Sequence, residues 1–88
     1  MKRGLIIDPR DNVGIVLEQV YPGDVIDFGD LKITAIEEIS LPHKVALKDF
    51  AVDDYVYKYG EVIGYITAEA PRGSHIHVHN LDSERLMK

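Results

Sequence analysis

The sequence predicts an all-β protein, a small single domain of seven or eight short strands. Apolar and polar residues alternate with a period of two, and clusters of turn-forming residues interrupt these runs at short intervals. Essentially no helix is expected. A length of 88 residues corresponds to one domain over residues 1–88 with a thin core. Tight turns or a partner subunit are therefore expected to contribute to stability.

The N-terminal half is expected to form strands at residues 4–7, 13–20, 25–26 and 31–39. In the second of these, the alternation predicts Val13, Ile15 and Leu17 on one face and Val16 on the other. Residues 22–23, Pro-Gly, fit the centre of a type II turn, where Pro fixes the first φ and Gly permits a positive second φ. The strand period is lost at residues 37–38, which predicts either a β-bulge or a single helical turn.

The C-terminal half is expected to contain extended segments at residues 42–50, 55–59, 62–63, 66–70 and 75–79. The alternating tyrosines of residues 55–59 predict a half-buried aromatic ridge, with Lys58 on the opposite face. Gly60 is expected at a bend, and Gly64 at a point of close backbone approach. Residues 82–88 are expected to form a polar tail, with room for one helical turn from Leu81.

Composition and charge exclude several classes of protein. The chain has no cysteine, and therefore neither a disulfide framework nor thiolate chemistry. No apolar run approaches the ~20 residues of a membrane span, so no membrane association is expected, and a cytoplasmic location follows by default. The formal charge of −5, with no cluster of Lys and Arg, argues against nucleic-acid binding.

Three of the four histidines lie in the segment 75–79, where they alternate with Ile76 and Val78. In a strand, His75, His77 and His79 would project to the same side, roughly 7 Å from one to the next. Imidazoles are the commonest metal ligands. Three of them close a site only with a further ligand, so a strand with a His-rich solvent face is the alternative interpretation.

The fourth histidine, His43, follows Pro42 in an extended run. In a strand it would share a face with Val45 and Leu47, whereas its neighbour Lys44 would face the other side. A histidine on an apolar face is more often a satisfied core residue than a catalytic group. Both interpretations of His43 stay open at this point.

Three separated motifs resemble the SAF domain of the altronate and galactarate dehydratases. They are HKVALKD at residues 43–49, KYGEVIG at residues 58–64 and HVHN at residues 77–80, and residues 11–13 and 22–23 fit the start of that domain. The resemblance implies a β-clip fold. In this family the domain is either the N-terminal part of a long chain or a separate small subunit beside a large catalytic one, as in sulfolactate sulfo-lyase.

The resemblance also implies a reaction, the β-elimination of water or sulfite from a hydroxy acid. Such a reaction needs a base for the proton α to the carboxylate and a cation that stabilises the enediolate. Family members depend on a divalent metal, usually iron. The implied partners are therefore a large catalytic subunit and a small-molecule hydroxy acid, with Fe²⁺ in a shared or partner site and little or no activity in the small subunit alone.

Carried over by position, the family's motifs nominate site residues. The candidates for catalysis are His43, Lys44, Lys58, Tyr59 and Gly60. The candidates for metal binding are His77, His79 and, less closely matched, His75, and Asn80 is the candidate for the shared substrate site. The chain departs from the pattern at Pro42, where members commonly have Gly, and at residues 53–54, where they tend to have a Gly.

Two classes of function fit these features. The first is the small subunit of a metal-dependent lyase that dehydrates a sugar acid or desulfonates sulfolactate. The second is a non-catalytic SAF module that binds a carbohydrate or a protein. The His-rich segment and residues 58–60 favour the first class, because a purely binding module does not need them.

Overall fold

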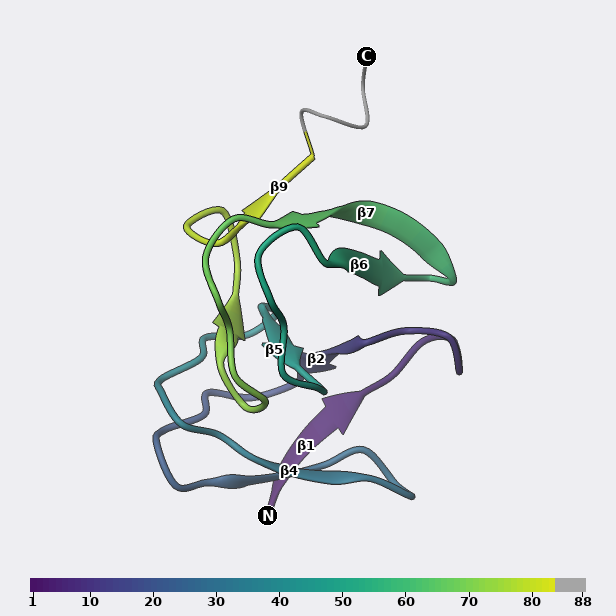
Figure 1. Ribbon diagram of the computed structural model, residues 1–88. Helices are drawn as coiled ribbons and strands as arrows, with labels where there is room; N and C mark the ends of the chain where they lie inside the picture. Colours follow the sequence, from purple (N-terminus) through teal and green to yellow (C-terminus); the bar gives the residue numbers. More distant parts are fainter. Residues whose placement is uncertain (84–88) are drawn as a thin grey trace.

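The computed structural model describes residues 1–83, which form nine short strands and no helix (Figure 1). The strands are β1 (Lys2–Leu5), β2 (Val13–Val16), β3 (Val25–Asp27), β4 (Lys32–Thr34), β5 (Lys44–Ala46), β6 (Tyr55–Lys58), β7 (Glu61–Ile66), β8 (His75–Ile76) and β9 (Leu81–Asp82). This confirms the predicted all-β class. Within the described residues, no helix is long and apolar enough to cross a membrane.

The strands form two sheets. Six strands pair in the order β4-β3-β1-β2-β5-β8, and β6, β7 and β9 form a second, three-stranded sheet in that order. Only β1 and β3 pair in parallel; every other pairing between these strands is antiparallel. The three-stranded sheet lies across one end of the six-stranded sheet, next to β2 and β5 (Figure 1).

The central strands β2 and β5 contribute to two hydrophobic clusters, one on each of their faces. Val13 and Ala46 are cross-strand partners, and both pack in a cluster with residues of β6, β7 and β8. Val16 and Val45 pack in the other cluster, with residues of β3 and β4. Val13 and Val16 therefore lie on opposite faces, as predicted. Leu17 does not extend the apolar face of Val13, because β2 ends at Val16 and Leu17 is exposed.

Several turns follow the sequence prediction. Gly23 has a φ of +91°, and the Asp24 amide donates to the Tyr21 carbonyl at 3.0 Å, as a type II turn requires. Gly60 forms the predicted bend between β6 and β7 with a φ of +72°. At Gly64, an added Cβ would lie 2.7 Å from the Asp82 carbonyl oxygen of β9, which explains the absence of a side chain there.

Other predicted segments are shorter or different. Residues 36–37 form a bend, neither a β-bulge nor a helical turn, and Ile39 then bridges to Val20. A β-bulge instead separates Val56 from Tyr57 and interrupts the alternation expected for residues 55–59. No strand forms at residues 66–70, because β7 ends at Ile66 and a single bridge pairs Ala70 with Phe50.

The C-terminal part of the prediction is only partly covered. Leu81 and Asp82 form β9, so the helical turn suggested from Leu81 does not begin there. The remaining residues of the predicted polar tail, 84–88, lie outside the described part of the chain.

Candidate functional site

The pairing of β5 with β8 brings the fourth histidine to the other three. Lys44 lies opposite Ile76 and Val45 opposite His75. Continuing this antiparallel register by one position places His43 opposite His77, on the same face as His75. Residues 32 positions apart in the sequence thus become neighbours at the edge of the six-stranded sheet.

Three imidazole rings stack at this edge. The ring of His43 lies 4.2 Å from that of His77 and 4.9 Å from that of His75, centroid to centroid, with interplanar angles of 14° and 7°. His43 Nδ1 and His75 Nε2 are 2.8 Å apart, at hydrogen-bond distance. All three rings are half-buried. We refer to His43, His75 and His77 as the histidine cluster.

The histidine cluster has the donor set of a divalent metal site. One nitrogen from each ring lies within 4.8 Å of the other two. Nitrogens bound to one ion at metal–nitrogen distances of about 2.1 Å lie at most about 4.2 Å apart, so small side-chain rotations suffice to bring them together. Three imidazoles with an open fourth position are a common catalytic arrangement.

Burial and mutual repulsion favour the neutral form of two imidazoles of this cluster, His75 and His77. The pKa of His75 is lowered from 6.5, first by burial and then by the neighbouring rings of His43, His79 and His77. The pKa of His77 is lowered by the same kinds of cause, burial first, then His43 and Lys44. A neutral imidazole presents a free nitrogen lone pair, the form that binds metal.

The predicted His strand is wrong beyond Ile76. The strand β8 ends there, and residues 77–80 form a turn, which we call the histidine loop. In an extended strand His75 and His79 would be about 13 Å apart; their rings lie 5.1 Å apart because the loop folds back. Ile76 is fully buried whereas Val78 is 80% exposed, so these two do not share an apolar face.

Asn80 holds the histidine loop in this conformation. Its side-chain oxygen accepts a hydrogen bond from the His77 amide at 2.9 Å, and its side-chain nitrogen donates to the His75 carbonyl at 2.8 Å. Asn80 is itself buried. Because both ends of its amide are used by the backbone, Asn80 positions the two histidines.

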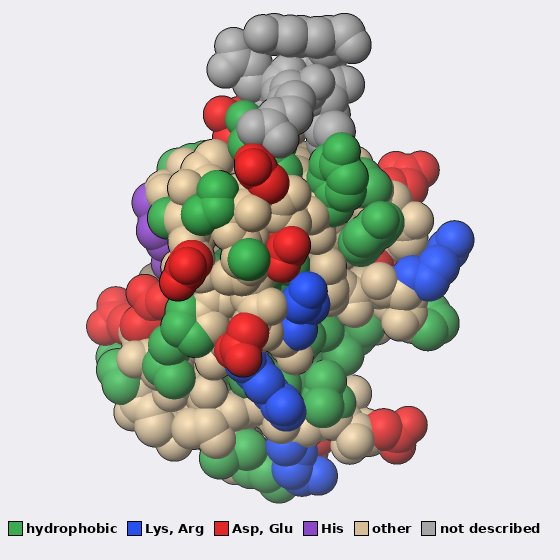
Figure 2. All heavy atoms as spheres, viewed as in Figure 1, with side chains coloured by type: hydrophobic (Ala, Val, Ile, Leu, Met, Phe, Trp, Pro, Cys, Tyr) green, Lys and Arg blue, Asp and Glu red, His purple; other side chains and the backbone are tan. Residues whose placement is uncertain are grey.

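Glu37 is a neighbour of the cluster that the sequence did not reveal. Its carboxylate accepts a hydrogen bond from the His75 backbone amide at 3.0 Å and acts against the lowering of the His75 pKa. The only signal in the sequence was the loss of strand period at residues 37–38. Figure 2 shows histidine side chains at the left edge of the face in view, with acidic and hydrophobic side chains beside them.

Lys44 connects the cluster to the predicted segment at residues 58–60. It is half-buried, and its pKa is lowered from 10.5 by burial and, to a smaller degree, by the nearby ammonium of Lys58. Lys44 in turn lowers the pKa of His77. Among residues 1–83, neither lysine forms an ion pair with a carboxylate. These basic groups therefore lie near one another without a neutralising acid.

Tyr59 and Gly60 form the two-residue turn of the β6–β7 hairpin. Both have positive φ, +59° and +72°, as a type I′ turn requires. The carboxylate of Asp11 accepts hydrogen bonds from the Tyr59 amide at 3.1 Å and the Gly60 amide at 2.8 Å. A Cβ at Gly60 would collide with the Arg10 guanidinium. Local conformation thus accounts for Gly60, and Lys58 Nζ lies 4.9 Å from the Tyr59 ring centroid.

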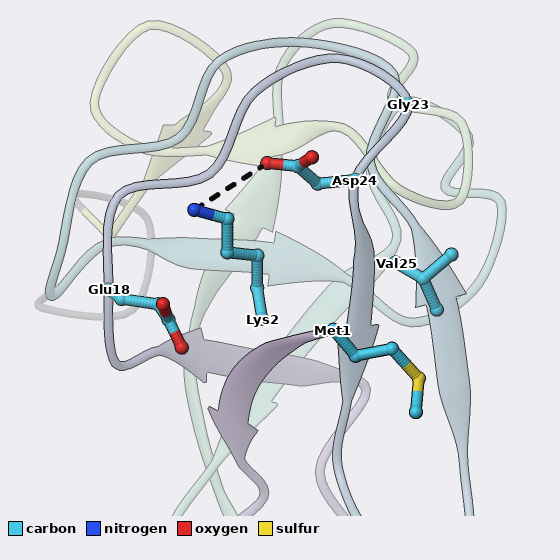
Figure 3. Close-up of a pocket in the computed structure, with 6 residues that line it drawn as sticks. All are labelled: Met1, Lys2, Glu18, Gly23, Asp24 and Val25. Atoms are coloured by element: carbon cyan, nitrogen blue, oxygen red, sulfur yellow. Dashed lines mark ion pairs between the residues drawn. The ribbon is translucent and has the colours of Figure 1, made fainter.

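A surface pocket of about 490 Å³ lies elsewhere, beside the N-terminus and the turn before β3 (Figure 3). Its lining includes Lys2 and Asp24, whose charged groups pair at 4.0 Å. None of the candidate site residues lines it. Among the described residues, the candidate functional site is therefore the histidine cluster with Lys44, and this pocket is separate from it.

Comparison with known proteins identifies the family. The model of the altronate/galactarate dehydratase SAF domain matches residues 2–84. The chain is 42% identical over 59 residues to the (2R)-sulfolactate sulfo-lyase subunit alpha of Paracoccus pantotrophus, covering 67% of this chain and 88% of that protein. It is 33% identical over 88 residues to the corresponding subunit of Chromohalobacter salexigens, covering 92% and 94%.

The single-chain enzymes of the family are much longer. The chain is 34% identical over 80 residues to the altronate dehydratase of Bacillus subtilis, which covers 91% of this chain but 16% of that enzyme. The altronate dehydratase of Escherichia coli is likewise matched over 15% of its length. The chain therefore spans only a small part of these dehydratases. From the family match over residues 2–84 and these relatives, the chain belongs to the altronate/galactarate dehydratase SAF-domain family.

Proposed function

We propose that this chain is the small subunit of a metal-dependent lyase. The enzyme would dehydrate a sugar acid, or release sulfite from sulfolactate, in an active site shared with a large catalytic subunit. The observation that carries the proposal is coverage: the match to the Chromohalobacter sulfo-lyase subunit alpha spans 92% of this chain and 94% of that protein. A chain of this kind is expected in the cytoplasm.

In this proposal His43, His75 and His77 hold the divalent metal, Fe²⁺, together with ligands from the large subunit. His43 replaces His79 in the ligand set expected from the sequence, because the three donor nitrogens that converge belong to positions 43, 75 and 77. His79 lies beside His75 without joining that set. When bound, the metal supplies a cation that stabilises the negative charge developing on the substrate.

Lys44 and Lys58 are proposed to attract the carboxylate of the hydroxy acid. Both carry basic side chains, and no carboxylate among residues 1–83 pairs with them. A bound carboxylate would act against both causes that lower the pKa of Lys44, which are burial and, second, the repulsion by Lys58. Tyr59 and Gly60 hold Lys58 at the end of its hairpin, and Asn80 positions the histidines. The described chain offers no evident general base, so the large subunit is expected to supply it and the small subunit alone to be inactive.

The test is reconstitution. The chain is produced with the polypeptide of the same genome that resembles the remainder of altronate dehydratase, and Fe²⁺-dependent turnover of altronate, galactarate and sulfolactate is assayed. Either protein alone should show no turnover, and the mixture should be active on one of the three. The variant His43→Ala should reduce turnover by at least about a hundredfold and lower the bound iron, measured by elemental analysis.

His79→Ala is the matched control. It also removes an imidazole beside His75, but one outside the three converging donors, so iron content and turnover should stay within about threefold of the parent. A large chain that is fully active without this partner would disprove the proposed function. Equal loss of iron in the His43 and His79 variants would disprove the assignment of ligands while leaving the subunit role intact.

A further inference from the structure

Exposed aliphatic side chains border the histidine cluster. Val78 is 80% exposed, Leu41 53% and Ile36 51%. Scattered exposed apolar residues are ordinary on a protein surface, but several around one polar site are typical of an interaction surface.

The chain connectivity places each of these residues beside the cluster. Val78 follows His77 directly, and Leu41 lies two residues before His43. Ile36 precedes Glu37, whose carboxylate bonds the His75 amide, and the Ile36 amide donates to the Gly73 carbonyl at 3.1 Å. Since consecutive Cα atoms are about 3.8 Å apart, each aliphatic residue lies within about 8 Å of a member of the site.

Two carboxylates lie next to these exposed aliphatic residues. Glu37 and Glu38 are both exposed next to Ile36, and no ion pair within residues 1–83 neutralises either of them. The complementary surface would therefore be apolar at its centre and cationic where it meets these two carboxylates.

We infer that Ile36, Leu41 and Val78, around the histidine cluster, form the surface on which the large catalytic polypeptide docks, with Val78 inserted into an apolar pocket of that partner. This inference rests on the proposed function and adds to it the location of the interface. The docking covers the open side of the histidine cluster, so the metal site is completed at the boundary between the two chains.

The occupant follows from the relatives of this chain. The chain corresponds to 16% of the altronate dehydratase of Bacillus subtilis, so in that enzyme a much larger remainder is part of the same polypeptide as this domain. The histidine cluster needs a further ligand and a base, which a partner on this face would supply. A stable interface of about 800 Å² per partner would take roughly one sixth of the 5096 Å² surface of this chain.

The test measures the affinity of the chain for the dehydratase-like large polypeptide of the same genome, by sedimentation and by hydrogen exchange. Val78→Asp should weaken the complex by about tenfold or more, because an aliphatic anchor is replaced by a charge in an apolar pocket. In the parent complex, the amides of residues 76–80 should exchange more slowly than in the free chain. The melting temperature of the free variant should be unchanged, since Val78 makes few contacts.

Leu5→Asp is the matched control. Leu5 is a 46% exposed aliphatic residue on β1, three strands from β8, and it projects from the face opposite to that of His75. The Leu5→Asp complex should stay within about twofold of the parent. A wild-type complex that Val78→Asp leaves intact, or that Leu5→Asp weakens equally, would overturn this inference alone. So would a homodimer of the small chain that Val78→Asp dissociates. Failure of the wild-type chains to associate would overturn the proposed function as well.

Discussion

At the scale of single residues, the histidine cluster lies beside a lysine, Lys44, that is itself close to a second lysine, Lys58. Lys44 is half-buried between the histidine cluster and the β6–β7 hairpin, and its pKa is lowered by burial and by Lys58. A lysine whose pKa is lower in the folded than in the unfolded state loses its proton more easily on folding. The ammonium is therefore a local cost to stability that a bound carboxylate would offset.

The Lys58→Met variant tests this coupling. Removing the second ammonium should raise the pKa of Lys44, although burial will keep it below 10.5. Because the unfolded chain binds more protons between the folded pKa and 10.5, the free energy of unfolding should rise with pH across that window, and less so in the variant. Nitrogen NMR of the Lys44 side chain measures the first effect, and denaturation at a series of pH values measures the second.

Lys48→Met provides the control for that experiment. Lys48 pairs with Asp54 at 3.5 Å and does not contribute to the Lys44 pKa shift. If the pKa of Lys44 rose equally in both variants, the shift would come from the overall charge of the protein and not from Lys58.

At the scale of elements, the histidine loop is held by one buried amide. Asn80 bonds the backbone of His75 and His77. Asn12 plays the same role elsewhere: its side chain accepts from the Tyr57 amide at 2.8 Å and donates to the Tyr55 carbonyl at 3.0 Å, attaching β6 to the turn before β2. The two asparagines form a natural pair of substitutions, one in the histidine loop and one in the turn before β2.

The Asn80→Ala variant is expected to lose about 2 kcal/mol of stability and to lower the Zn²⁺ affinity of the chain by about tenfold, because His77 loses its fixed position. Asn12→Ala should also be destabilising but should change Zn²⁺ affinity by less than about threefold. Calorimetric Zn²⁺ titration and chemical denaturation measure the two effects. Parent binding is expected to be weak, since residues 1–83 offer three imidazoles without a converging carboxylate. If both variants lost affinity equally, Asn80 would act through stability and not through His77.

At the scale of the whole molecule, close backbone contacts join segments far apart in the sequence. Gly73, in the turn before β8, has a φ of +91°, and an added Cβ would collide with the Thr34 carbonyl oxygen at the end of β4. The Gly73 amide also donates to the Ala46 carbonyl of β5 at 2.9 Å. This contact connects the histidine edge of the six-stranded sheet to its opposite end.

Gly73→Ala and Gly23→Ala separate the steric contact from backbone strain. Both glycines have a φ of +91°, but a Cβ at Gly23 would meet nothing within 4 Å. Gly23→Ala should cost about 1 kcal/mol from strain alone, whereas Gly73→Ala should cost about 3 kcal/mol. In a domain of this size the difference corresponds to roughly 10 °C in melting temperature, measured by circular dichroism. Equal melting temperatures would mean that the turn at Gly73 can move away from Thr34.

The sequence by itself determined the fold class, the turns and the family. Period-two alternation and turn residues report local backbone preferences, so the strands of the N-terminal half, the type II turn at Gly23 and the bend at Gly60 could be predicted. Three spaced motifs identified the SAF domain, which the family match over residues 2–84 confirms.

Only the tertiary structure decided which histidines meet. His43 joins His75 and His77 because β5 pairs with β8 in one particular register, and a register is set by non-local packing that no local pattern encodes. The strand of histidines was overpredicted for a related reason: Asn80 reaches back to His75 and His77, and these bonds replace extended pairing after Ile76. The sequence thus showed which residue types could form the site. Which of those residues come together depended on the pairing of β5 with β8, which brings His43 into contact with His75, 32 residues away.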